Sequence, residues 1–194
     1  MSTFTAVFVL FLVIGTLVQL WLLQRHLSHV AGHRNRVPEA FADKVELAEH
    51  QRAADYTRAK GGIARIEILF GSLLLLLWTL GGGIDLLDQY WRGFGWESLL
   101  TGLALFFSFF FISSLLSLPL DLVRTFRIET AFGFNRTTPQ QFLKDKLLGA
   151  VLGVALGAPL LWTILWLMQR AGDLWWLAAW AVWIAFTLII TLSL

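Results

Sequence analysis

Long apolar runs alternate with polar segments along the chain. Five of the runs approach the roughly 20 apolar residues that a membrane-crossing helix needs. They cover about residues 4–23, 63–80, 99–120, 147–168 and 174–194. Four carry no charged residue, and the second carries only Arg65 and Glu67, near its start. None shows the two-residue alternation of a membrane β-strand, so the pattern predicts an all-α, polytopic membrane bundle of five transmembrane helices.

Composition narrows the class of protein. The 194 residues are 57% hydrophobic and 14% charged, with a mean hydropathy of +0.70, whereas soluble domains average about 25% charged residues. A chain of this length is usually one domain, so we expect residues 1–194 to form a single membrane domain surrounded by lipids, with no nucleic-acid partner. Cysteine is absent, which excludes disulfides, thiolate nucleophiles and cysteine-bound metals.

The distribution of charge predicts the orientation of the chain in the membrane. Thirteen of the 15 Lys and Arg residues lie within residues 24–65 or 121–146, and basic connections stay on the cytoplasmic side. We therefore expect connections 24–62 and 121–146 to be cytoplasmic, the N-terminus outside and the C-terminus in the cytoplasm. Because cysteine and an import signal are absent, we expect a bacterial inner membrane.

A further helix is expected in the first cytoplasmic connection. Residues 38–60 contain no internal helix breaker. Their thin apolar face consists of Phe41, Val45, Ala48 and Tyr56, at helical spacing. Pro38 suits a first helical position, and the pair Gly61-Gly62 is expected to end the helix. The sequence thus predicts a weakly amphipathic cytoplasmic helix that precedes the second span.

The second cytoplasmic connection contains the sequence RIETAFGFNRTTPQQFLKDKL, residues 127–147, in which several helix-start and helix-end signals lie close together. Gly133 is expected to end a helix that projects from the third span. Thr138, Pro139 and Gln141 predict the start of the next helix, with the threonine as N-cap and the proline in the first turn. The residues between these two helices must therefore form a tight corner.

The composition of this corner is unusual for a plain helical hairpin. Phe132 and Phe134 are aromatic, Glu129 is acidic, and Asn135 can cap a helix or adopt a left-handed backbone. A simple connection needs none of these side chains. We therefore expect the corner to dock on another element.

Glycine and proline residues shape the third and fourth spans. Gly149, Gly153 and Gly157 follow one another at four-residue spacing, so they form a smooth stripe on one helix face that a neighbouring helix can approach. Pro119 and Pro159 are expected to bend their helices. We interpret the glycine stripe as helix packing rather than as a ligand site.

Three sequence features resemble a known family. They are YTRAKGGIARIE at residues 56–67, the proline in SLPLDLVRTF, and the pattern E-x-x-F-G-F-N followed by F-L-x-D. The residues of the last pattern are Glu129, Phe132, Gly133, Phe134, Asn135 and Asp145. Together with the order of five spans, these features resemble the N-terminal membrane region of the CAAX prenyl proteases, which are integral-membrane zinc metallopeptidases. The resemblance covers nearly the whole chain.

The resemblance implies a role within a larger enzyme. In that family an H-E-x-x-H helix and a further glutamate bind zinc after the fifth span, and the membrane helices enclose a water-filled chamber. The family cleaves peptides near a lipidated C-terminal cysteine. This chain would then form part of the chamber wall, and residues 127–146 would dock the C-terminal protease portion. Zinc and the peptide substrate would belong to the complete enzyme.

The chain itself lacks the chemistry of that reaction. Its four histidines are His26, His29, His33 and His50, and none begins H-E-x-x-H. We therefore expect no catalytic residue, no bound metal and no peptidase activity from this chain alone. The first three histidines can share one helix face, but interfacial histidines are the favoured interpretation.

One acidic residue near the membrane interior is a separate candidate. Glu67 lies at the start of the second apolar run, and ionisable groups within spans are functional candidates by default. Pairing with Arg65, or extension of the carboxylate towards the interface, is an equally good explanation.

The sequence is compatible with two further classes of function. The chain could be a non-catalytic membrane scaffold or partner-binding protein of the same fold. It could also be a small transporter or channel subunit, although four uncharged spans argue against an ion pathway. A reading frame that continues with H-E-x-x-H after Leu194 would support the protease, and a stop codon there would support the scaffold.

Overall fold

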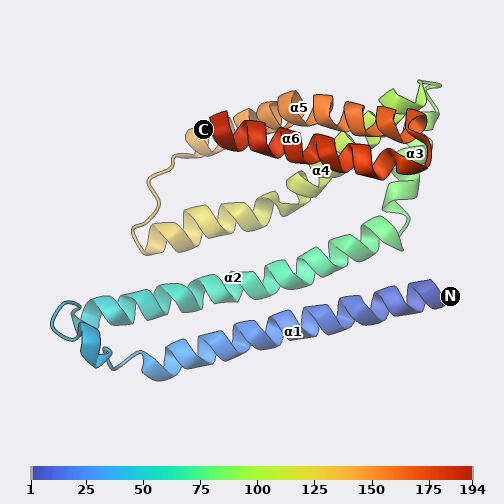
Figure 1. Cartoon of the computed structure of the whole chain (residues 1–194). Helices are drawn as coiled ribbons and strands as arrows, with labels where there is room; N and C mark the ends of the chain where they lie inside the picture. The colour runs from blue at the N-terminus through green and yellow to red at the C-terminus, as the bar shows by residue number, and fades with distance from the viewer. Residues whose placement is uncertain (1, 194) are drawn as a thin grey trace. The chain divides into compact units, whose positions relative to one another are not determined.

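Every regular element of the computed structural model, which describes residues 2–193, is helical (Figure 1). The elements are α1 (Thr3–His33), η1 (Glu39–Phe41), α2 (Leu47–Thr79), α3 (Gly83–Arg92), α4 (Ser98–Leu122), η2 (Val123–Glu129), α5 (Pro139–Arg170), η3 (Gly172–Leu174) and α6 (Trp175–Ser193). The elements η1 and η3 are single 3₁₀ turns, and η2 is a π-helical segment that continues α4. The prediction of an all-α fold is confirmed.

Five helical segments among the described residues are long and apolar enough to cross a membrane. They are Thr3–His33, Leu47–Thr79, Ser98–Glu129, Pro139–Arg170 and Gly172–Leu192. Four of them contain 31 to 33 residues, and at 1.5 Å per residue such helices exceed the roughly 30 Å hydrocarbon core of a bilayer. The five predicted spans are thus confirmed, and the longer helices extend past the apolar layer.

The contacts of the chain divide it into two compact units. One comprises Met1–Gly81 and Leu116–Arg136, and the other comprises Gly82–Leu115 and Thr137–Leu194. One of the three points at which the chain passes from one unit to the other, between residues 115 and 116, falls within α4. The prediction of a single membrane domain stays a prediction.

In the first unit, α1 and α2 lie side by side and antiparallel (Figure 1). Between the middle of α1 and the second half of α2, the Thr16 and Ser72 hydroxyls form a 2.7 Å hydrogen bond. At the middle of α2, a Cβ atom on Gly61 would lie 2.5 Å from the side chain of Leu27. The helices can therefore approach this closely because glycine has no side chain at position 61.

An ion pair joins the residue after the last turn of α1 to the first part of α2. Asp55 accepts hydrogen bonds from Arg34 Nε at 2.8 Å and from Arg34 Nη2 at 2.7 Å. The hydrogen bond to Asp55 raises the pKa of the Arg34 guanidinium above its ordinary value. Arg34 therefore remains charged, and the two-pronged pair fixes the register of the hairpin.

In the second unit, α5 and α6 form a helical hairpin (Figure 1). The start of α4 packs against α5, where a Cβ atom on Gly102 would lie 3.0 Å from Leu165. The Trp91 indole of α3 donates a 2.9 Å hydrogen bond to the Ser108 hydroxyl of α4. Serine in this span thus bonds a neighbouring helix, as is usual within a membrane.

The expected separate helix over residues 38–60 is wrong in both of its boundaries. After Pro38 the chain forms only the turn η1, and α2 begins at Leu47. The helix then continues through Gly61 and Gly62 to Thr79. A glycine inside a helix costs only about 0.5–1 kcal/mol, and the contact of Gly61 with Leu27 compensates for this cost. The predicted amphipathic helix is the first part of α2.

Two other boundaries differ from the sequence prediction. The first helix extends to His33, about ten residues beyond its predicted end near residue 23. The glycines that end α2 also open α3, a helix the apolar pattern did not indicate because it is short and polar. Gly82, with φ of +75°, makes this turn.

Other local predictions are confirmed. Thr138 is the N-cap of α5, where its hydroxyl accepts a 3.2 Å hydrogen bond from the Gln141 backbone, and Pro139 occupies the first turn. Gly133 ends the preceding helical stretch with φ of +78°. Pro119 and Pro159 lie inside α4 and α5, whereas the bends expected there stay a prediction.

Candidate functional site

The best-defined candidate site is the corner that follows η2, residues 129–135. The Glu129 carbonyl accepts backbone hydrogen bonds from Phe134 at 2.8 Å and from Asn135 at 3.2 Å. Two donors on one carbonyl close the helix end, and the positive φ of Gly133 allows the chain to reverse. The Asn135 side-chain amide donates a 3.0 Å hydrogen bond to the Thr130 hydroxyl. The corner is therefore a helix C-cap built by its own residues.

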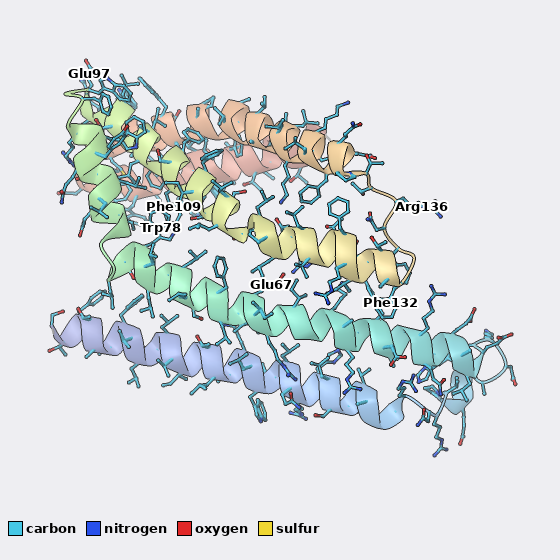
Figure 2. All side chains as sticks on the ribbon, turned by 180° about the vertical axis from the view of Figure 1, so that it is seen from behind. Glu67, Trp78, Glu97, Phe109, Phe132 and Arg136 are labelled. Carbon is cyan, nitrogen blue, oxygen red and sulfur yellow. The ribbon has the colours of Figure 1, made fainter. Side chains whose placement is uncertain are left out.

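Within the first unit this corner lies against α2. The ring of Tyr56 is 5.2 Å from that of Phe132 and 4.8 Å from that of Phe134, measured between centroids. Arg52, one turn earlier, donates a 2.7 Å hydrogen bond to the Phe132 carbonyl. Figure 2 shows Phe132 at the end of the helical segment that runs beside α2. The Tyr56 ring thus contacts both phenylalanine rings in tilted geometries, which aromatic pairs prefer to face-to-face stacking.

Gly133 is constrained in two ways at this contact. Its backbone adopts φ of +78°, which side-chain-bearing residues rarely do, and a Cβ atom there would lie 3.3 Å from Arg52 Nη2. A larger residue would strain the backbone and press on the arginine that bonds the corner. Glycine is therefore favoured at this position by the turn, and a side chain would also displace the Arg52 guanidinium slightly.

A second feature of the same unit is a charged pair at the level of the spans. Arg124, in η2, donates a short hydrogen bond to the Glu67 carboxylate of α2. The Glu67 side chain is 27% exposed, and Figure 2 shows it on the side of α2 towards this segment. Of the explanations that the sequence left open, pairing with Arg65 does not occur: Arg65 donates to the Gln24 side chain of α1. Glu67 therefore links α2 to the third span.

The arginine of this pair lies in the π-helical segment η2. Val123–Glu129 contains Arg124 and begins four residues after Pro119. Proline inside a helix removes one backbone hydrogen bond, and π-type turns often accompany functional positions. The widened turn contains the arginine that meets Glu67 and leads directly into the docked corner.

An open pocket of about 290 Å³ adjoins these groups in the first unit. Its polar lining includes His26 from α1, Tyr56, Lys60 and Glu67 from α2, and Arg124 from η2. The Lys60 amine lies 5.2 Å from the centre of the Tyr56 ring, in a cation–π arrangement. The pocket can hold polar or charged groups, and its wall connects the docked corner with the Glu67–Arg124 pair.

The remaining sequence-predicted residues lie in the second unit. Asp145 is exposed on α5. Within the described part of the chain no atom comes within 4 Å of a Cβ built on Gly149 or Gly153, whereas at Gly157 the ring of Phe107 would lie 3.8 Å away. The expected close approach of a helix along the whole glycine stripe is therefore limited in this chain to Gly157.

The histidines form no metal centre with the rest of the described chain. Across residues 2–193 no group of three or more His, Cys, Asp or Glu side chains is placed to hold a metal ion. His29 and His33 stack, with ring centroids 4.2 Å apart, and His50 bonds the His33 carbonyl at 2.9 Å. These residues close the hairpin between α1 and α2.

The roles of three residues of the site were not predicted from the sequence, although Tyr56 was assigned to the apolar face of its helix. Arg52 and Tyr56 hold the corner, and Arg124 pairs with Glu67. For Arg124 a signal existed: an acidic residue in an apolar run needs an opposite charge, and Arg124 is the first basic residue after the third run. For Arg52 and Tyr56 only the tertiary contact reveals the role.

Comparisons with known proteins identify the family of this chain. The model of the family described as CAAX prenyl protease N-terminal, five membrane helices, matches residues 26–194. A CAAX prenyl protease 1 homolog of Dictyostelium discoideum is 23% identical over 170 residues, covering 84% of this chain and 39% of the relative. The probable CAAX prenyl protease 1 of Schizosaccharomyces pombe is 28% identical over 185 residues, covering 88% and 38%.

The fold has a counterpart among solved structures. The crystal structure of S. mikatae Ste24p superposes with a TM-score of 0.80 at 18% identity, covering 98% of this chain and 44% of that one. The chain spans about two fifths of the length of these relatives. With a family match over most of its residues and five membrane helices in the expected order, the chain belongs to the CAAX prenyl protease family, as an N-terminal membrane region.

Proposed function

We propose that this chain is the membrane-embedded N-terminal portion of a zinc metalloendopeptidase of the CAAX prenyl protease type. The match of residues 26–194 to the family's N-terminal region is the observation that supports this proposal. The matched relatives are named as CAAX prenyl proteases and extend well beyond the aligned part. The peptide substrate and the protease portion are inferred for the complete protein.

Zinc has no ligand set on this chain. No suitable group of His, Cys, Asp or Glu side chains occurs among residues 2–193, and structural or catalytic zinc requires three or four such ligands. The described residues therefore do not fit the metal. We assign the zinc ligands to the protease portion and no catalytic step to this chain.

The proposed contribution of this chain is to position the rest of the enzyme. Phe134 is 60% exposed although one face of its ring contacts Tyr56, so a partner can cover the other face. The corner and the residues around it, 127–146, form the proposed docking surface for the protease portion. The helices that carry the Glu67–Arg124 pair form part of the proposed chamber wall.

The test uses the product of the complete gene in detergent or proteoliposomes. Cleavage of a peptide ending in a prenylated CAAX sequence is expected, and chelation of zinc should abolish it. Gly133→Val and Asn135→Ala should lower cleavage or thermal stability, because the first strains the turn and the second removes the hydrogen bond to Thr130. Gly15→Val, at an open position on α1, is the control.

Two results would overturn the proposal in distinguishable ways. Unchanged cleavage and stability in both corner variants would remove the docking role while leaving the enzyme assignment. A gene product without H-E-x-x-H and without cleavage would remove the enzyme assignment and favour the scaffold. The orientation in the membrane, with residues 127–146 cytoplasmic, and the bacterial inner membrane are part of this proposal; the relatives named above are eukaryotic.

A further inference from the structure

A second pocket of about 380 Å³ lies between α1 and α2, apart from the corner and from the Glu67–Arg124 pair. Its polar lining consists of Gln24 and Ser28 from α1 and Arg58 and Arg65 from α2, with Gly62 between the two arginines. No acidic residue is among the described residues that line it. We refer to it as the two-arginine pocket.

Helix geometry places the two arginines on one face of α2. Arg58, Gly62 and Arg65 follow at intervals of four and three residues, so they lie in one row, with the arginines about 10 Å apart along the axis. Gly62 contributes no side chain, and within the described chain nothing lies within 4 Å of a Cβ atom built on it. The row is therefore a recess flanked by two guanidinium groups.

The opposite wall adds uncharged polar groups. Gln24 and Ser28 are one turn apart on α1, and the Gln24 amide donates a 3.2 Å hydrogen bond to the Ser28 hydroxyl. Arg65 donates from Nη2 to the Gln24 carbonyl oxygen, which holds this guanidinium at the pocket. Its remaining N–H groups, with the hydroxyl of Ser28, are suitable donors to a phosphate.

The positive charge of this pocket is not neutralised by ion pairs within the described chain. Asp55 lies less than one turn before Arg58 and attracts its charge. Both Asp55 oxygens, however, accept hydrogen bonds from Arg34, and Asp55 forms its ion pair with Arg34 rather than with Arg58. Glu67, two residues after Arg65, pairs with Arg124. Neither Arg58 nor Arg65 forms an ion pair among residues 2–193. An anion is the missing partner of complementary charge.

The position of the pocket along the helices indicates which anion. On α1 the apolar run ends at Leu23, directly before Gln24, and on α2 the uninterrupted apolar run begins after Glu67. The pocket thus lies where both helices pass from apolar to polar, which is the level of lipid phosphates in a bilayer. Beside it, Trp21 and Ile66 are 59% and 54% exposed, so acyl chains can cover them.

We propose that the two-arginine pocket binds the phosphate of an anionic phospholipid, with Arg58 and Arg65 on either side of the phosphate and Gly62 beneath it. Basic pockets between membrane helices are suited to anionic lipid headgroups. The exposed apolar surface beside the recess favours a lipid over free phosphate. This inference does not depend on the proteolytic function.

Native mass spectrometry of the purified chain in mild detergent tests the proposal. Phosphatidylglycerol should bind at least about tenfold more tightly to the wild type than phosphatidylcholine does, and Arg58→Gln with Arg65→Gln should remove most of this preference. Gly62→Leu should weaken binding as well, because its side chain fills the recess without changing the charge. Thermal stability in the same detergent verifies that each variant is folded.

Two control variants separate the pocket from general effects. Arg36→Gln with Arg92→Gln removes the same charge from exposed pairs elsewhere and should retain the preference. Gly71→Leu adds the same side chain at another open position of α2 and should also retain it. Equal loss in pocket and control variants, or equal binding of both lipids, would overturn the proposal. Complete displacement of the lipid by millimolar inorganic phosphate would assign the pocket to a soluble anion instead.

Discussion

At the scale of single residues, one glycine determines how closely the first two spans approach. Gly61 is buried in the middle of α2, and the buried Leu27 side chain of α1 occupies the space next to its Cα atom. Gly71, on the same helix, has no atom of the described chain near its Cβ position. The two glycines therefore offer a matched comparison.

Replacing Gly61 should weaken the α1–α2 hairpin. In Gly61→Val the new side chain overlaps Leu27, and overpacking of this kind costs about 1–3 kcal/mol. Gly71→Val places the same side chain in open space and should leave stability nearly unchanged. Thermal unfolding in detergent measures both variants; equal melting temperatures would show that the contact contributes nothing to stability.

A second residue-scale feature is the pair of Glu67 and Arg124. Either single change to glutamine leaves the other, part-buried charge without its ion-pair partner, so each should destabilise the protein by about 1–3 kcal/mol. The double change Glu67→Gln with Arg124→Gln should cost clearly less than the sum. Urea or thermal unfolding of the four proteins gives the coupling, and strict additivity would contradict a direct interaction.

At the scale of elements, α2 shows how tertiary contact overrides local sequence. Two adjacent glycines predict a helix end, yet α2 continues through both of them for a further 17 residues to Thr79. The contact with α1 makes the glycine at position 61 favourable rather than disruptive. The predicted cytoplasmic amphipathic helix and the second span are consequently parts of one continuous helix, and its first part contacts the docked corner.

The residues at the start of α5 are sufficient to predict where this helix begins. The Thr138 hydroxyl caps the Gln141 backbone amide, so Thr138→Ala should cost about 1 kcal/mol, whereas Thr138→Asn, another good N-cap, should retain most of the stability. The measurement is thermal unfolding in detergent. An equal loss in both variants would mean that the threonine acts through some other contact.

At the scale of the whole molecule, the described chain combines five long apolar helical segments with polar contacts that join neighbouring helices within each compact unit. The candidate site uses residues from α2, η2 and the corner, which are far apart in sequence but belong to one compact unit. The family membership gives this unit its proposed role beside a protease portion.

The orientation of the whole molecule can be measured directly because the natural chain has no cysteine. Arg136→Cys is expected to react with an impermeant maleimide only from the cytoplasmic side, and Gly95→Cys only from the opposite side, since basic connections remain cytoplasmic. Labelling of intact cells and of inverted membrane vesicles distinguishes the two faces. The reverse pattern would invalidate the proposed docking of residues 127–146 to a cytoplasmic protease portion.

Much of this protein follows from its sequence alone. Apolar run length dictates the five spans, because backbone in hydrocarbon must satisfy its hydrogen bonds within a helix. Local chemistry dictates the Thr138 cap and the turn at Gly133, because each depends only on residues a few positions away. The family resemblance also follows from the sequence, because each of its three features is a short run of residues in the chain.

Only the tertiary structure decided which distant side chains meet. It joined Tyr56 to Phe132 and Phe134, gave Glu67 the partner Arg124 instead of Arg65, and carried α2 through Gly61. These outcomes depend on which helix faces are in contact. When every face of a membrane helix is apolar, its sequence pattern does not indicate which face packs against a neighbouring helix. Local patterns fix where helices lie along the chain, whereas packing fixes the register and the partners on which the candidate site depends.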